Sequence, residues 1–117
     1  MGLPVKLYSY SSCSTCRKAI AWLKERGYSP EPIDITTIPP SPGELALALE
    51  QLGRKRLFNT SGLSYRALGS AVVNAMDDDQ ALAALAADGK LIKRPFLVID
   101  GPRVVTGFKA EEWQELL

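Results

Sequence analysis

The two cysteines of the chain lie three residues apart, between a segment typical of a strand (VKLYS, residues 5–9) and one with helical periodicity (RKAIAWL, residues 17–23). Cys13 is therefore expected at the N-terminal end of a helix, where unpaired N–H groups and the helix dipole favour an anion. At such positions the pKa of a cysteine can fall from about 8.5 to roughly 3.5–7.5. We predict a redox-active pair, with Cys13 as the nucleophile and Cys16 as the resolving thiol.

The numbers of cysteine and histidine residues limit the kinds of active site and metal site that the chain can form. Two cysteines in 117 residues fall three apart by chance in about one chain in sixty, so the spacing itself favours a redox motif. The chain has no histidine, which excludes an imidazole base, a Cys–His dyad and a Cys₂His₂ zinc site. Two thiols also fall short of the four ligands of a structural zinc site, so we predict no metal. An inert, buried pair is the alternative interpretation.

Length and composition predict one globular domain over residues 1–117, with 46% hydrophobic and 23% charged residues. No apolar run approaches the ~20 residues that span a bilayer, and the first four residues do not resemble a signal peptide. We therefore expect a cytoplasmic protein, and a monomer. The net charge of +1 gives no reason to expect direct binding of nucleic acid.

The N-terminal part of the chain predicts a strand–helix–strand unit. A helix over residues 14–26 ends at Gly27, and a strand over residues 32–34 follows it. Two capping boxes then mark helix starts, Ser41 with Glu44 and Asp77 with Gln80. The corresponding helices are expected to end at Gly53 and near Gly89, with a shorter helix over residues 64–68 between them.

The C-terminal part predicts a hairpin and a closing helix. Strands over residues 96–99 and 103–106 flank the turn Asp100-Gly101-Pro102, and a helix covers residues 110–117. The element order is β-α-β, a helical insert at about residues 41–89, and β-β-α. This order predicts an α/β fold with a thioredoxin-like, four-stranded mixed sheet and a helical insertion between strands 2 and 3.

Lys93-Arg94-Pro95 precedes the third predicted strand. In thioredoxin-like folds the loop at this place faces the cysteine turn, and its proline is commonly cis and exposes backbone groups to the substrate. Without that resemblance a trans bond would be predicted, because cis occurs in only about 5–6% of X–Pro bonds. The planar guanidinium of Arg94 suits a thiolate, an oxyanion or a carboxylate. A solvated arginine is the alternative.

Other polar residues carry weaker predictions. Ser14 and Thr15 are expected either to offer backbone N–H groups to a bound oxyanion or to cap the helix. The cluster Arg54-Lys55-Arg56 is expected to be a solvated surface, and Asp77-Asp78-Asp79 a helix start. Aromatic side chains are expected to pack in or beside the core, in particular Trp22, Tyr65 and Trp113.

Three segments together carry a family resemblance: Cys13-Ser-Thr-Cys16-Arg-Lys-Ala, Asn59-Thr-Ser-Gly62 and Ile92-Lys-Arg-Pro-Phe96. In order and spacing they resemble the arsenate reductase (ArsC)/Spx family nearly end to end. That family has a thioredoxin-like sheet with a helical insertion, matching residues 41–89 here. Its branches are arsenate reductases coupled to glutaredoxin, the redox-sensing regulator Spx, and YffB-like proteins proposed to be glutathione-dependent thiol reductases. The chain looks closest to the YffB-like and Spx/MgsR-like branches.

The resemblance implies roles for Cys13 as the nucleophile and Arg94 as an oxyanion-binding arginine. Two further arginines of the arsenate reductases fall on Asn59 and near Gly107 in this chain. Each missing charge-assisted contact is worth about 1.5–3 kcal/mol, so robust arsenate reduction is not expected. The alternative is that Arg66 or Arg103 takes the place of a missing arginine in the folded protein.

The predicted function is a thiol–disulfide oxidoreductase with no bound cofactor. The resemblance implies glutathione as the reductant, with glutaredoxin or thioredoxin as coupled partners. The alternative is an Spx-like regulator that binds the C-terminal domain of the RNA polymerase α subunit through a switch formed by Cys13 and Cys16. Substrate-binding residues are expected to be Ser14, Thr15 and Pro95, with Arg94 acting beside the thiols.

Overall fold

The computed structural model describes residues 4–100 and 102–117. Four strands form one mixed sheet in the order β2-β1-β3-β4. Strand β1 pairs in parallel with β2 and antiparallel with β3, which pairs antiparallel with β4. The predicted mixed sheet is therefore confirmed. Its strands are β1 (Val5–Ser9), β2 (Ile33–Asp34), β3 (Phe96–Ile99) and β4 (Arg103–Thr106).

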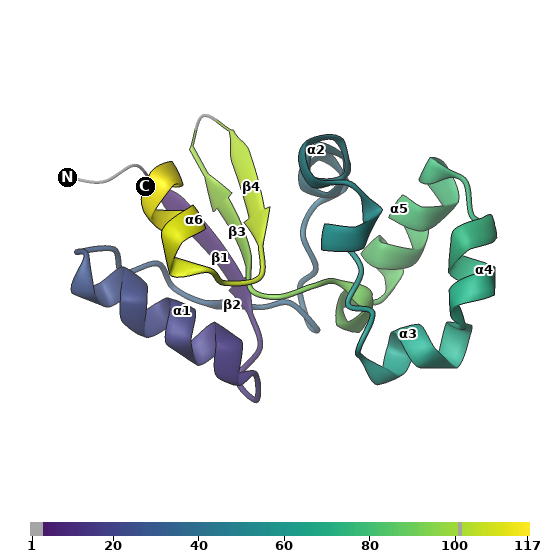
Figure 1. The fold of residues 1–117 in the computed structure, drawn as a ribbon, viewed down its shortest axis with the longest axis horizontal. Helices are drawn as coiled ribbons and strands as arrows, with labels where there is room; N and C mark the ends of the chain where they lie inside the picture. Colours follow the sequence, from purple (N-terminus) through teal and green to yellow (C-terminus); the bar gives the residue numbers. More distant parts are fainter. Residues whose placement is uncertain (1–3, 101) are drawn as a thin grey trace.

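Helical layers cover both faces of the sheet (Figure 1). Helices α1 (Ser14–Glu25) and α6 (Ala110–Leu116) lie on one face, and the helical insert lies on the other. Because successive strand residues point to opposite faces, Leu7 packs in the core with α1 and α6, whereas Tyr8 packs in the core with the insert. The aromatic residues predicted to pack do so in these two cores: Trp22 and Trp113 in the first, Tyr65 at the second.

The regular elements of the insert between β2 and β3 are all helices in the described residues. Both predicted capping boxes are present: Ser41 exchanges hydrogen bonds with Glu44, and Asp77 with Gln80. These local bonds explain why two helices begin where the sequence predicts. The insert consists of α2 (Pro42–Leu52), η1 (Arg54–Arg56), α3 (Leu63–Leu68), α4 (Ser70–Ala75), α5 (Asp78–Ala87) and η2 (Gly89–Leu91).

Helix α4 is the largest departure from the predicted elements. The segment has no side-chain cap, contains two β-branched valines, and buries only Val73 against the core. These features give a weak helical pattern in the sequence. Gly69 separates α4 from α3 with a positive φ of 88° that favours glycine.

Other differences are small. Strand β2 has two residues rather than three because Pro32, which has no N–H, precedes it. Helix α1 ends one residue earlier than predicted, with Gly27 at φ 83° after it. The turn residue Gly101 and the N-terminal residues 1–3 lie outside the described part of the chain. Within that part, no helix is long and apolar enough to cross a membrane.

Candidate active site

Cys13 is the N-cap of α1, the residue immediately before the first helical position. Its sulfur accepts a hydrogen bond from the backbone N–H of Cys16 at 3.3 Å, while its own N–H donates to the carbonyl of Tyr10 at 3.0 Å. A group that accepts from the free N–H donors of a helix is stabilised there as an anion. The predicted strand–turn–helix setting of the two cysteines is confirmed.

The two thiols, both free in the structure, have opposite electrostatic environments. Burial alone raises the pKa of Cys13, but the side chain and N–H of Cys16, the charge of Arg94 and the N–H of Thr15 outweigh burial. The pKa of Cys13 therefore lies below its ordinary value. Burial, followed by the hydrogen bond with Cys13, raises the pKa of the fully buried Cys16 to about 12. Cys13 is thus the thiol that ionises, and Cys16 keeps its proton.

Ser14 and Thr15, between the cysteines, are exposed. Thr15 lines the same pocket as Cys13, and its backbone N–H contributes to the low pKa of that thiol. The group that caps α1 is the sulfur of Cys13, so the predicted capping role belongs to Cys13 rather than to Ser14 or Thr15. Their contact with a substrate remains a prediction.

Arg94 and Pro95 are joined by a cis peptide bond, as the thioredoxin-like resemblance implies. The positive charge of Arg94 acts on both cysteines, and its guanidinium lies over the Tyr10 ring with its carbon 4.8 Å from the ring centroid. Within the described residues, Nη1 of Arg94 is buried and has no hydrogen-bond partner. A buried donor without a partner is costly, so this atom is suited to receive an anion.

Pro95 is buried. Its carbonyl accepts a hydrogen bond from the N–H of Gly107 at 2.9 Å, which joins the start of β3 to the end of β4. The carbonyl of Pro95 is therefore already occupied by the protein. The predicted contact of Pro95 with a substrate remains a prediction.

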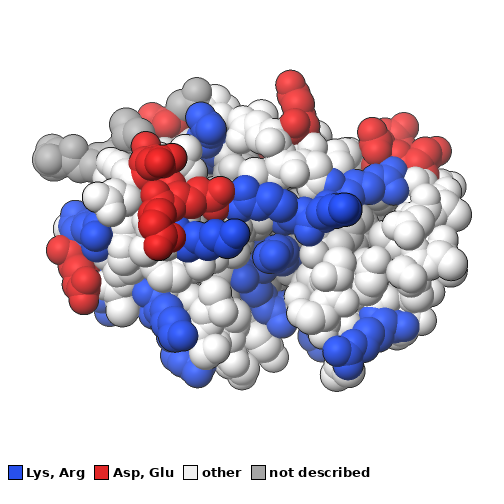
Figure 2. All heavy atoms as spheres, viewed as in Figure 1, with Lys and Arg blue, Asp and Glu red and all other residues white. Residues whose placement is uncertain are grey.

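The thiol of Cys13 opens into a pocket of about 630 Å³ between the sheet and the insert. Figure 2 shows lysine and arginine side chains gathered in a band across the middle of one face of the molecule. No carboxylate belongs to the pocket wall in the described residues. The pocket is therefore suited to anionic ligands. Its basic residues are Arg56, Lys93, Arg94 and Lys109.

Asn59 and Gly107, the positions where the resemblance predicts missing arginines, both line this pocket. Neither suggested substitute reaches it: Arg66 is exposed on α3, and Arg103 lines a separate hollow. The additional arginine at the pocket is Arg56, which the sequence analysis assigned to a solvated surface. Only its basic neighbours marked this residue in the sequence, and they gave no indication of its place in the fold.

The prediction that Arg54-Lys55-Arg56 forms a solvated surface is wrong for two of the three residues. Arg56 is partly buried and forms a two-point ion pair with Glu112, with N–O distances of 2.7 and 2.9 Å. It also donates to the carbonyl of Thr106 at 3.0 Å, and the Thr106 hydroxyl donates to the Arg56 carbonyl. Arg54 pairs with Asp78 at 2.9 Å. Ion pairs with carboxylates that are distant in sequence hold both arginines against the protein surface.

Acidic and thiol groups are scattered across the fold. In residues 4–100 and 102–117, no three side chains of the histidine, cysteine, aspartate and glutamate types gather in a way that could hold a metal ion. Asp77 is the N-cap of α5, and Asp78 and Asp79 lie in its first turn, which confirms the predicted helix start. The charged residues that line the pocket of Cys13 in the described part of the chain are all basic.

The sheet order and the cysteine at the N-terminus of α1 define a thioredoxin-like protein. Comparison with known families and structures agrees, and the chain belongs to the ArsC family, whose model matches residues 8–116. It is 43% identical to the uncharacterized protein YusI of Bacillus subtilis, over 97% of this chain and 98% of that protein. The crystal structure of a possible arsenate reductase from Streptococcus mutans superposes with a TM-score of 0.84 at 40% identity, covering 96% and 98% of the two chains.

More distant relatives include members of all three branches that the family resemblance predicts. The chain is 27% identical to the global transcriptional regulator Spx of Lactiplantibacillus plantarum, over 97% of this chain and 86% of that protein. It is 29% identical to the arsenate reductase of Neisseria meningitidis serogroup A, over 86% and 88%. The structure of a YffB protein superposes with a TM-score of 0.83 at 27% identity, covering 96% and 97%. The predicted family and fold are confirmed.

Proposed function

We propose that this protein is a thiol–disulfide oxidoreductase in which Cys13 attacks a substrate disulfide and Cys16 resolves the product. The observation that carries this proposal is the opposite shift of the two thiol pKa values, downward for Cys13 and up to about 12 for Cys16. A thiolate is the attacking species in disulfide exchange. One partly exposed thiolate beside one buried, protonated thiol therefore makes Cys13 the attacking thiol and Cys16 the resolving thiol.

The reaction proceeds by two exchanges. The Cys13 thiolate bonds to one sulfur of the substrate, the substrate S–S bond breaks, and the departing thiolate takes a proton from solvent. Cys16 then loses its proton to solvent and attacks the sulfur of Cys13, which releases the second substrate thiol and leaves a Cys13–Cys16 disulfide. The substrate has gained two electrons and the protein has lost two.

The reductant that restores the two thiols is a cellular thiol, and glutathione is the small thiol that this pocket suits. Its carboxylates complement basic pocket residues such as Lys93, Arg94 and Lys109. Glutaredoxin or thioredoxin would serve as a protein reductant of the same bond. This coupling belongs in a reducing compartment, so we propose that the protein acts in the cytoplasm.

Single cysteine substitutions test the proposal. With a glutathione-capped disulfide as substrate, Cys13→Ser should abolish turnover, while Cys16→Ser should accumulate a mixed disulfide on Cys13 that mass spectrometry detects. Turnover that persists in Cys13→Ser would contradict the proposal. The reduction potential of the pair should fall near those of cytosolic thiol reductases, at about −200 to −270 mV.

Arsenate is a poor candidate substrate for this pocket. Arg94 has a buried Nη1 without a partner, but Asn59 and Gly107 have no positive charge, and Arg56 is already paired with Glu112. A tetrahedral oxyanion would meet a single unpaired guanidinium among these groups. Any arsenate-dependent turnover should therefore be slow relative to disulfide reduction.

The similarity to Spx supports a second candidate function, a redox switch that binds the C-terminal domain of the RNA polymerase α subunit. Cys13 caps α1 through its sulfur, so forming a disulfide with Cys16 would change the first turn of that helix. A pull-down with the isolated α C-terminal domain, under oxidising and reducing conditions, separates the two functions. Absence of binding in both states would remove the second candidate.

A further inference from the structure

A second hollow, of about 360 Å³, adjoins the pocket of Cys13. The two hollows have common walls, because the same four residues line both: Asn59, Ser61, Gly62 and Arg94. Arg94, whose charge acts on Cys13, is therefore also part of the wall of the second hollow. A ligand bonded to Cys13 that also occupies the second hollow would contact these shared residues.

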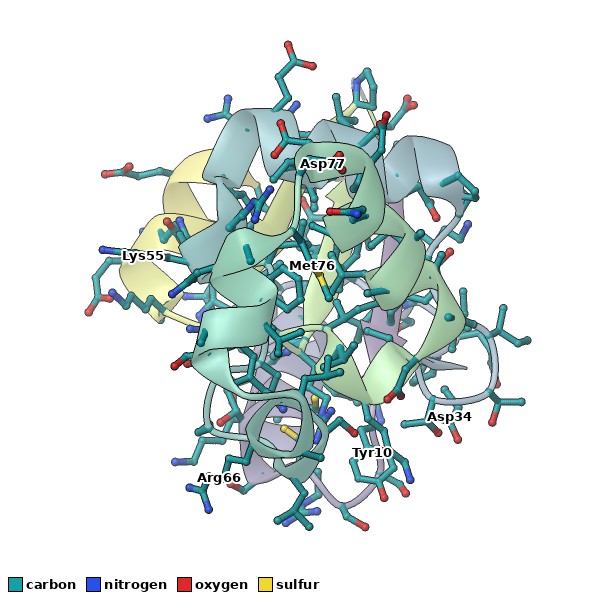
Figure 3. The ribbon with its side chains drawn as sticks, turned by 90° about the vertical axis from the view of Figure 1, so that its right-hand side faces the viewer. Tyr10, Asp34, Lys55, Arg66, Met76 and Asp77 are labelled. Atoms are coloured by element: carbon teal, nitrogen blue, oxygen red, sulfur yellow. The ribbon has the colours of Figure 1, made fainter. Side chains whose placement is uncertain are left out.

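Part of the wall of the second hollow is apolar, and some of that apolar surface is exposed. Tyr10 and Leu63 line it, and Leu63 has 82% of its surface exposed at the start of α3. Figure 3 looks onto the insert and shows α3 nearly end-on between the labelled side chains of Tyr10 and Arg66. A leucine this exposed contributes nothing to the core, but it offers apolar surface to a bound partner.

The charged residues that line the two hollows are all basic in the described part of the chain. Lys90 and Arg94 line the second hollow, and Lys93 and Lys109 are among the cations of the first. In the described residues, neither wall includes an aspartate or a glutamate. Acidic groups on each side of a bound sulfur would therefore meet lysine or arginine.

We propose that the preferred substrate is a protein disulfide whose cysteine lies in an extended acidic segment, with an apolar residue of that segment packed on Leu63. This inference rests on the proposed function, since Cys13 must react with disulfides. A peptide is the occupant because it carries a sulfur to Cys13, negative charge to the lysines and an apolar side chain to Leu63 together.

Peptides that carry an activated cysteine test this inference. Three peptides of equal length would have acidic, neutral or basic residues around a central cysteine and leucine, with the cysteine linked to 2-thiopyridine. Cys13 attacks the peptide sulfur and expels the uncharged pyridine thione, whose absorbance reports the rate. The Cys16→Ser protein stops the reaction at this mixed disulfide. Uncharged dithiodipyridine measures the intrinsic reactivity of Cys13.

We expect the acidic peptide to react about tenfold faster than the basic one at low ionic strength, with a smaller ratio in high salt. In the Cys16→Ser protein, the added substitution Leu63→Ser should lower the reaction rates of all three peptides by about tenfold. It should leave the reaction rate with dithiodipyridine unchanged. Lys90→Glu should lower the ratio of acidic to basic rates. Matched controls are Val72→Ser, half exposed on α4 outside both hollows, and Lys24→Glu, exposed in the last turn of α1.

Two results would overturn the inference: equal rates for acidic and basic peptides, or a Leu63→Ser protein that behaves like Val72→Ser. Either result, with normal reactivity toward dithiodipyridine, would leave the proposed oxidoreductase function intact. Failure of Cys13 to react with dithiodipyridine would instead contradict the proposed function itself. The experiment therefore separates the preference for a substrate from the chemistry of the thiol.

Discussion

The guanidinium of Arg56 and the carboxylate of Glu112 form a two-point ion pair at the edge of the candidate active site, with N–O distances of 2.7 and 2.9 Å. Arg56 comes from η1 of the insert and Glu112 from α6, on opposite sides of the sheet. The pair joins the insert to α6 and neutralises a guanidinium that lines the pocket of Cys13. It therefore bears on both stability and anion binding.

Glu112→Gln should release Arg56 for anions. The variant keeps the contact of Arg56 with the Thr106 carbonyl but removes the paired charge, so phosphate should protect Cys13 from iodoacetamide roughly threefold to tenfold more strongly than in the wild type. The measurement is the alkylation rate of Cys13 against phosphate concentration. Glu111→Gln, exposed on the same helix, is the matched control. Equal protection in both variants would contradict the prediction.

Arg94→Gln should raise the pKa of Cys13, because the variant removes a positive charge that favours the thiolate. The sign is fixed: the thiolate fraction at neutral pH falls, so alkylation slows and its pH profile moves to higher pH. The pH dependence of iodoacetamide alkylation measures this shift, and buried Cys16, with a pKa of about 12, does not interfere. Arg17→Gln is the control, because the guanidinium of Arg17 donates its hydrogen bond to the Ser11 carbonyl, at 2.7 Å, and not to Cys13. An unchanged profile in Arg94→Gln would argue against this role.

Glu44 should contribute a pH-dependent part of the stability. Burial raises its pKa, but hydrogen bonds from the Tyr8 hydroxyl, the Ser41 N–H and Lys6 outweigh burial and hold the pKa below 4.5. A carboxyl with a lowered folded pKa stabilises the protein above its unfolded pKa, and this stabilisation is lost as the pH falls through the folded value.

Glu44→Gln should therefore lower the free energy of unfolding by about 1 kcal/mol near neutral pH, after allowance for solvent screening. The difference from the wild type should shrink at acidic pH, as the pH falls through the lowered folded pKa and the wild-type carboxyl itself becomes protonated. Urea unfolding at both pH values measures this, with Glu50→Gln at the exposed end of α2 as control. A difference independent of pH would contradict the charge-based explanation.

Gly89→Ala should destabilise the fold strongly. A Cβ at Gly89 would lie 1.8 Å from the carbonyl oxygen of Ile35, so the backbone of η2 or of the β2 loop would have to shift. We expect a loss of about 2–4 kcal/mol in the free energy of unfolding, measured by urea denaturation. Gly43→Ala is the control, because its Cβ would meet only Ser41 Oγ, at 4.0 Å. Equal stability of both variants would show that η2 can move freely.

Features encoded by neighbouring residues were predicted well. The capping boxes at Ser41 and Asp77 join residues three positions apart, so the sequence alone reveals them. The setting of Cys13 at a helix start was predicted for the same reason. The cis bond before Pro95 needed the family resemblance in addition, because the residues alone favour trans.

Features that depend on distant residues were missed or misassigned. Helix α4 has no local cap and little buried surface, so its helical pattern is weak. Arg56 was expected in solvent because its partner Glu112 is 56 residues away. The open alternative that Arg66 or Arg103 replaces the missing arginines needed the structure, which places neither residue in the wall of the Cys13 pocket.

The sequence by itself determined the order of elements, the helix starts and the location of the thiol pair, since each arises from hydrogen bonds and periodicity within a few residues. Only the tertiary structure decided which cations surround Cys13, that Arg56 is neutralised, and that Leu63 lies exposed beside the reactive pocket. The physical reason is that charge pairing and burial depend on distances in space, which follow from how the insert packs on the sheet.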